Sequence, residues 1–138
     1  PTRSSAASDV YKRQALDNPP KLEQASVIEF QEAQKKGHLI IDIRRSEEWV
    51  ETGIIQGAET ITAFTKSGAL HPDFQKKFFP LIDDEDTPVY LYCRTGNRTG
   101  TLGNALVNQV GLRKVLHLST GIVGWKKDGL LTVPYKSD

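Results

Sequence analysis

The amino-acid sequence predicts an α/β fold, in which a parallel sheet carries helices on both faces. Short apolar runs alternate with stretches of helical character along the chain, the order expected for strands joined by helices. The runs within 38–45, 88–92 and 114–118 are too short for helices and typical of strands buried on both faces. The length of 138 residues is that of one ordinary domain. We therefore expect a single domain built around one sheet.

The first predicted helix has a recognisable start and stop. Ser26 and Glu29 have the spacing of a capping box, so the helix is expected to begin at Ser26 and to stop near Gly37. Residues 38–45 then form the first buried strand. The polar, proline-containing residues 15–22 before Ser26 are predicted to be a lead-in.

The next segment is predicted to hold two helices and a short strand. Ser46 is expected to cap a short helix that carries Trp49. Residues 54–62 are interpreted as a turn followed by a strand. Residues 71–82 are predicted to form a helix over one face of the sheet, ended by Pro80.

The second half of the chain brings a cysteine to the end of a strand. The strand at 88–92 delivers Cys93 at its carboxyl end, and a helix is expected from near Thr99 to Val110, capped by Gly111. The apolar residues of this helix repeat every four positions: Leu102, Leu106 and Val110. A strand at 114–118 and a short helix within 119–129 complete the pattern. Ligands of parallel sheets bind beyond the carboxyl ends of the strands, which is where Cys93 is predicted to lie.

The beginning of the sequence is excluded from the fold prediction. The stretch "SDVYKRQ" at 8–14 resembles the translation of a transposon end used in sequencing libraries, so residues 1–14 are interpreted as a non-native scar. The folded domain is expected to span 23–138. Since a signal peptide could have preceded the scar, the compartment is left open between cytoplasm and periplasm.

The charge balance gives no reason to expect nucleic acid as a partner. The chain has 18 basic and 17 acidic side chains, and without residues 1–14 the count is 15 against 16. The basic and acidic residues removed are Arg3, Lys12, Arg13 and Asp9. No apolar run approaches the roughly 20 residues of a membrane-spanning helix. Small molecules are therefore the expected partners.

Neither a cofactor nor a metal ion is expected from the sequence. One cysteine cannot form an internal disulfide, and the three histidines lack the spacing of a zinc site. The histidines are His38, His71 and His117.

The loop after Cys93 has the composition of an anion-binding cradle. If residues 94–98 wrap around the sulfur, several backbone N–H groups and the start of the next helix would favour the thiolate, which is the nucleophilic form. Gly96 permits the tight turn, and Arg94 and Arg98 would attract an oxyanion. A buried, inert cysteine is the alternative, but the polar sequence that follows disfavours it.

The chain resembles the rhodanese family of sulfurtransferases. The resemblance rests on four stretches in the family's order, covering about residues 23–134: "IDIRRSEEW", "TGIIQGA", "YCRTGNRT" and "LSTGIVGW". It implies a five-stranded, mostly parallel sheet. The histidine that often follows the glycine of the second stretch is replaced by Ile54, and Thr120 stands where the family often has a glycine.

The resemblance implies a persulfide enzyme without a cofactor. Cys93 would take a sulfane sulfur from thiosulfate or a persulfide donor, and pass it to cyanide, a thiol or a sulfur-accepting protein. The substrate-binding residues implied are Arg94, Thr95, Gly96, Asn97, Arg98 and Thr99. The residues expected to support the loops are Asp42, Arg44 and Glu48. Trp49 and Trp125 are expected to pack in the core or at its rim.

Two other functions remain open from the residues. The domain could carry a persulfide, or sense an anion, without turnover, since a carrier needs the same cysteine. Phosphatases and arsenate reductases of related fold place an arginine after cysteine and five residues, but here that position holds Thr99, and Arg98 comes one place early. The shorter loop favours sulfur over a phosphoryl group.

Overall fold

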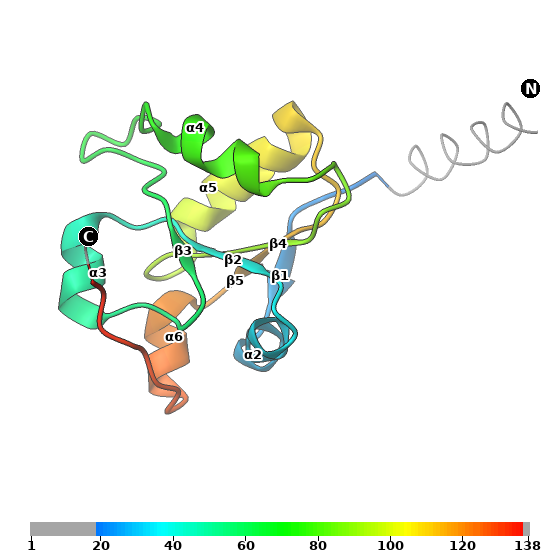
Figure 1. Ribbon diagram of the computed structural model, residues 1–138. Helices are drawn as coiled ribbons and strands as arrows, with labels where there is room; N and C mark the ends of the chain where they lie inside the picture. Colours follow the sequence, from blue (N-terminus) through cyan, green and yellow to red (C-terminus); the bar gives the residue numbers. More distant parts are fainter. Residues whose placement is uncertain (1–18, 137–138) are drawn as a thin grey trace, which may run out of the picture.

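The computed structural model describes residues 19–136. The predicted scar and the first part of the lead-in lie outside this range. The described residues form an α/β domain around a five-stranded sheet of order β1-β5-β4-β2-β3, in which each paired strand is parallel to its neighbour (Figure 1). The strands are β1 (Glu23–Ala25), β2 (Leu39–Asp42), β3 (Glu59–Thr60), β4 (Val89–Tyr92) and β5 (Val115–Leu118). The predicted fold class is confirmed.

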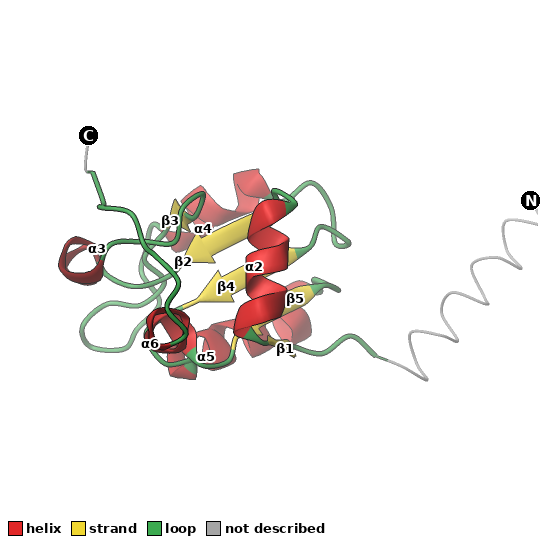
Figure 2. Ribbon diagram, turned by 90° about the horizontal axis from the view of Figure 1, so that it is seen from below, coloured by secondary structure: helices red, strands yellow, loops and turns green. Residues whose placement is uncertain are grey.

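The parallel register brings the carboxyl ends of the central strands together. Asp42 at the end of β2 pairs with Tyr92 at the end of β4, and Leu91 pairs with His117 on β5. Figure 2 shows the arrowheads of β2 and β4 pointing toward the end of the molecule where α3 and α6 lie. The residues that follow these strands therefore meet at one edge.

Helices cover both faces of the sheet, as predicted. On one face, α4 (Phe74–Phe78) and α5 (Asn97–Ala105) bury Phe74, Phe78 and Leu102 against the strands. On the other, α2 (Val27–Lys35) and α6 (Gly121–Lys127) bury Phe30, Ile122 and Trp125. The short helix α3 (Ser46–Thr52) lies beyond the end of β2, and a 3₁₀ turn at Phe79–Leu81 follows α4. Apolar burial on both faces explains why the central strands are almost continuously apolar.

The starts of three helices can be compared with those predicted from the sequence. The Ser26 and Glu29 capping box is present: each side chain accepts from the other residue's backbone N–H at 3.2 Å. Ser46 is not a cap, because Arg45 occupies that position and Ser46 is the first helical residue of α3. Helix α5 begins at Asn97, two residues before the expected start at Thr99, because Gly96 caps it with a left-handed φ of 101°.

The end of α5 departs from the predicted period. Residues Leu106–Val110 form a π-helical turn, capped by Gly111 with a φ of 90°. The wider turn shifts the side chains around the axis, so Leu102 and Leu106 are buried whereas Val110 is 46% exposed. Four-residue spacing therefore overestimates the buried face by one position.

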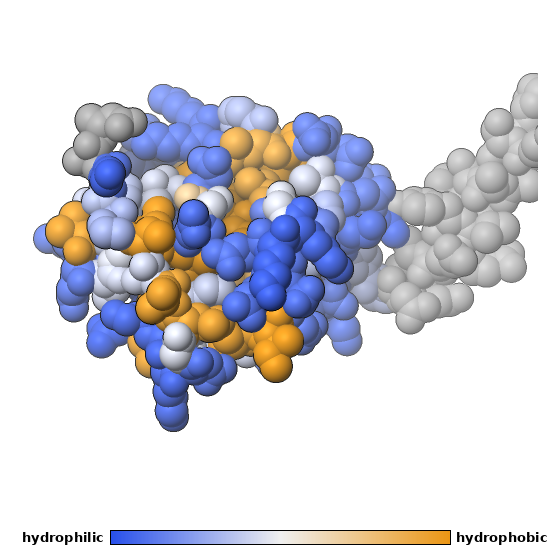
Figure 3. All heavy atoms as spheres, turned by 60° about the horizontal axis from the view of Figure 1, so that its bottom comes forward, coloured by the Kyte–Doolittle hydropathy of each residue, from blue (hydrophilic) through white to orange (hydrophobic). Residues whose placement is uncertain are grey.

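The surface on the side of α2 and α6 mixes hydrophilic and hydrophobic residues (Figure 3). Exposed large apolar side chains occur singly on several elements and include Ile28, Val123 and Leu131. Among the described residues, no helix has the length and apolarity needed to cross a bilayer.

Candidate active site

Cys93 follows the last residue of β4 and sits beneath the surface. Its side chain is 1% exposed and packs at the border of the core on the α5 side of the sheet. The sequence between Cys93 and α5 is only Arg94, Thr95 and Gly96, so the chain turns sharply before the helix begins. The sulfur therefore lies at the carboxyl end of a central strand and close to the N-terminus of a helix.

The loop presents two polar groups to the sulfur. The Gly96 N–H donates to Cys93 Sγ at 3.1 Å, and the Thr99 hydroxyl oxygen is 3.6 Å from it. Several backbone amides were expected to bond the sulfur, but among residues 19–136 the Gly96 N–H is the one that does. A Cβ on Gly96 would collide with the Ser119 carbonyl, and its φ of 101° disfavours other residues. Glycine thus allows the amide to reach the sulfur.

Helix α6 holds the loop from the other side. The Ile122 N–H donates to the Cys93 carbonyl at 2.9 Å, and the Val123 N–H donates to that of Arg94 at 3.2 Å. These are N–H groups of the first turn of α6, which have no partner inside their own helix. Backbone hydrogen bonds alone therefore attach the loop to α6.

Arg98 pairs with Glu48. Its two terminal nitrogens donate to the two carboxylate oxygens at 2.8 and 2.7 Å, in a bidentate pair between α5 and α3. Glu48 also accepts from the Arg45 N–H at 3.0 Å. The hydrogen bonds that Arg98 donates to Glu48 raise the pKa of Arg98, against the opposing effect of burial. The expected anion-binding role of Arg98 stays a prediction, because its guanidinium already has a carboxylate partner.

The same contacts keep Glu48 ionised. Burial by itself would raise the pKa of Glu48, but hydrogen bonds from Arg98 and from the Arg45 backbone, with the charges of Arg98 and Arg44, lower it from 4.5 to about 2. A lowered native pKa stabilises the fold above the ordinary value, and this contribution disappears as pH falls through the native value.

Replacing Glu48 by glutamine should reveal that contribution. We expect Glu48→Gln to lose about 1–3 kcal/mol of the free energy of unfolding at neutral pH, because Arg98 keeps only a neutral partner. The difference from wild type should shrink as pH falls from about 4.5 toward about 2, where the native carboxylate becomes protonated. Urea denaturation across this range would measure it. A difference that stays constant over the range would contradict the assignment.

Asp42 and Arg44 form a buried ion pair beside the loop. Their side chains are 0% and 1% exposed, and Arg44 Nη2 lies 2.8 Å from Asp42 Oδ2. Arg44 also donates to the Gly53 carbonyl at 2.9 Å and to Thr52 Oγ1 at 2.8 Å, which fixes the end of α3. Burial would lower the pKa of Arg44, but the hydrogen bonds to Asp42 and the negative charge of Asp42 raise this pKa above its ordinary value. The pair positions α3, and through it Glu48.

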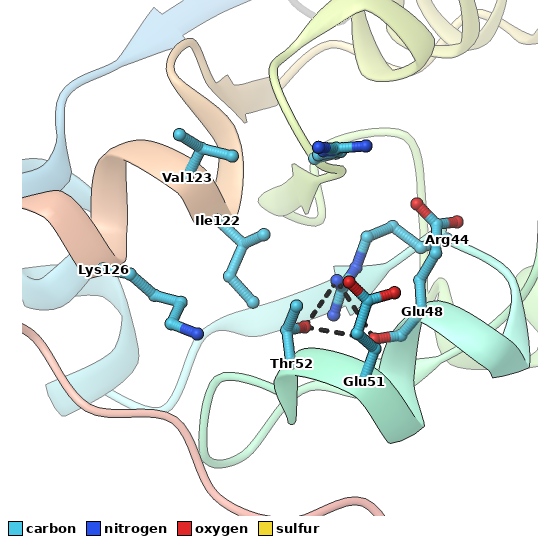
Figure 4. Close-up of a pocket in the computed structure, with 8 residues that line it drawn as sticks. Arg44, Glu48, Glu51, Thr52, Ile122, Val123 and Lys126 are labelled. Carbon is cyan, nitrogen blue, oxygen red and sulfur yellow. Dashed lines mark hydrogen bonds between the residues drawn. The ribbon is translucent and has the colours of Figure 1, made fainter.

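Two hollows at this edge share Arg94. One, of about 270 Å³, lies between α3 and α6 and is drawn in Figure 4, where Arg44 is directed toward Thr52 and Lys126 comes from the opposite helix. The other, of about 440 Å³, is lined by further cations, Arg45, Lys66 and Arg98. Within residues 19–136, Arg94 is exposed and forms no salt bridge. Arg94 is the cation that lines both hollows.

One buried residue of the site was missed from the sequence. His117 on β5 is 7% exposed, and its Nδ1 lies 2.8 Å from Thr99 Oγ1. A polar residue within the apolar run 115–118 was the available signal, but its partner is 18 positions away along the chain. Trp49 and Trp125 are 6% and 2% exposed, in agreement with packing. Among the described residues, no group of three His, Cys, Asp or Glu side chains could hold a metal ion.

A family model for the rhodanese-like domain matches residues 26–128, three quarters of the chain. The chain belongs to the rhodanese-like domain family. Relatives of this rhodanese-like domain include a Rickettsia prowazekii protein named "Uncharacterized protein RP600", 28% identical over an alignment 98 residues long that covers 66% of this chain and 79% of that one. A Rickettsia conorii protein named "Uncharacterized protein RC0915" is 26% identical over the same shares.

Solved structures confirm the rhodanese-like fold. The polysulfide-sulfur transferase homodimer of Wolinella succinogenes matches with a TM-score of 0.64 and 16% identity, over 94% of this chain and 90% of that one. A Rhodopseudomonas palustris protein described as a possible tyrosine phosphatase matches with a TM-score of 0.59 and 23% identity, over 81% and 85%. At such identities the likeness shows the fold alone.

Proposed function

We propose that this rhodanese-like domain is a sulfurtransferase that carries a sulfane sulfur on Cys93 as a persulfide. The observation that carries the proposal is the 3.1 Å hydrogen bond from the Gly96 N–H to Cys93 Sγ. An amide that points at the sulfur, at the N-terminus of α5, stabilises negative charge there. A thiolate is the form that attacks sulfur, so no separate base is needed at the moment of attack.

The transfer proceeds in two displacements. The Cys93 thiolate attacks the outer sulfur of thiosulfate, the S–S bond of thiosulfate breaks, and its electron pair leaves with sulfite. Cyanide or a thiolate then attacks the terminal sulfur of the persulfide, and the electron pair of that S–S bond returns to Cys93. Each step conserves charge and needs no oxidant, so the cycle follows ping-pong kinetics.

Arg94 is the proposed anion-binding residue. Its position on both hollows lets it approach the sulfonate end of thiosulfate from either side of the loop. Arg98 acts indirectly, because its guanidinium is hydrogen-bonded to Glu48 on α3. The sulfur is almost fully buried, which favours a small donor over a bulky one.

Thiosulfate and cyanide should give thiocyanate over many turnovers, and Cys93→Ser should reduce the rate to background because a hydroxyl is not ionised at neutral pH. Intact-mass analysis after thiosulfate alone should show one added sulfur atom. The chain has one cysteine, so the modified position is unambiguous.

The alternatives give different outcomes in the same experiment. A carrier would gain the sulfur atom but release about one equivalent of thiocyanate. Hydrolysis of a chromogenic phosphate ester that disappears in Cys93→Ser would instead indicate a phosphatase. Failure of thiosulfate and of a persulfide donor to add sulfur would overturn the proposal.

A further inference from the structure

The Thr99 hydroxyl has one proton and three polar neighbours. Its oxygen lies 2.8 Å from His117 Nδ1, 3.2 Å from the Gly96 carbonyl and 3.6 Å from Cys93 Sγ. The carbonyl can only accept a hydrogen bond, whereas a neutral imidazole nitrogen either accepts or donates. The proton position on His117 therefore decides where the Thr99 proton can point.

Two arrangements are available, and they treat the sulfur differently. If His117 Nδ1 accepts, the Thr99 proton is used in the shortest contact, and the hydroxyl can offer the sulfur only a lone pair. If Nδ1 carries the proton and donates, the Thr99 proton is released for Cys93 Sγ or for the Gly96 carbonyl. Only the second arrangement places a donor beside a thiolate.

We propose that neutral His117, protonated at Nδ1, is a positioning residue that orients the Thr99 hydroxyl as a hydrogen-bond donor to the Cys93 thiolate. When the sulfur carries a persulfide and the charge has moved outward, the same proton turns to the Gly96 carbonyl. His117 thus lets one hydroxyl serve both states of the loop. This inference rests on the proposed function only in that Cys93 is the reacting group.

The surroundings of His117 keep it neutral. Burial lowers its pKa, and the residues paired with it in register are Gln24 on β1 and Leu91 on β4, neither of which is charged. From α5 its polar contact is Thr99, beyond which lies Cys93. An uncharged ring is what a switchable donor requires.

The tautomer can be observed directly in the unmodified protein. Long-range ¹⁵N–¹H correlation NMR at neutral pH should show His117 protonated at Nδ1. His71 provides an internal reference, because its Nδ1 accepts from the Asp73 N–H at 3.1 Å and its proton must lie on Nε2 when the ring is neutral. The His117 signals are identified by their loss in His117→Asn. Finding both histidines with the proton on Nε2 would overturn the proposal.

Alkylation of Cys93 by iodoacetamide gives the functional readout. Thr99→Val, which removes the hydroxyl donor, should slow the reaction about tenfold at neutral pH, as expected for losing one hydrogen bond to a charged group. His117→Leu keeps the hydroxyl but removes the group that orients it, so it should slow the reaction by a smaller factor, and His117→Asn keeps a donor and should restore most of the rate. His38→Gln, at a half-buried position just before β2, is the control. Equal rates in all variants would contradict the proposal.

Neither measurement uses thiosulfate or cyanide. Absence of thiocyanate formation would therefore count against the proposed function and leave this inference standing. If the protein does transfer sulfur but His117 carries its proton on Nε2, the proposed function stands and this inference is wrong. The NMR result also remains decisive if His117→Leu fails to fold.

Discussion

Asp42→Ala is expected to cost about 3–5 kcal/mol of the free energy of unfolding, the cost of leaving one member of a buried ion pair alone. Arg44 is 1% exposed and donates hydrogen bonds to Asp42 from three groups, its backbone N–H, Nε and Nη2. The free energy of unfolding of an ordinary domain is about 5–15 kcal/mol in total, so the variant should be only marginally stable.

The matched control removes both charges. Asp42→Ala combined with Arg44→Met should be less destabilised than the sum of the two single variants, because no buried charge is left without a partner. Urea denaturation of the four proteins gives the coupling energy. If the effects of the single substitutions simply add, the buried pair does not act as a unit and our account of α3 positioning is wrong.

Gly121→Ala should strongly reduce the reactivity of Cys93. A Cβ at this position would collide with the Arg94 carbonyl group and lie 2.6 Å from the Thr95 nitrogen, and the φ of 66° is unfavourable for alanine. The nearest atoms are backbone atoms, so the loop itself must shift. A displacement of about 1 Å at a reacting centre can cost about 100-fold in rate. We expect a loss of that order in Cys93 alkylation and in any turnover.

Gly100→Ala provides the comparison for the same substitution. A Cβ on Gly100 meets nothing within 4 Å, and its backbone is helical within α5. Alanine should therefore stabilise the domain by about 0.5–1 kcal/mol and leave the alkylation rate unchanged. If Gly121→Ala behaves like Gly100→Ala, the close contact between α6 and the loop does not hold the sulfur in place.

The elements predicted correctly are those whose signals are local. The capping box at Ser26 depends on two residues three positions apart, and the buried strands β2, β4 and β5 are visible as short apolar runs. The strand β1 was missed, because its residues 23–25 are mostly polar and only Ala25 is buried. It is a strand by virtue of its pairing with β5, more than 90 residues further along the chain.

The candidate site divides in the same way. The sequence by itself determined that Cys93 ends a strand, that Gly96 turns the loop and that polar residues follow, because each depends on neighbours in the chain. The tertiary structure decided that Arg98 pairs with Glu48, 50 positions away, and that His117 reaches Thr99. Neighbouring parallel strands are joined by long connections, so residues at their carboxyl ends are far apart in the sequence. Which side chains meet there therefore depends on the order and register of the strands in the sheet.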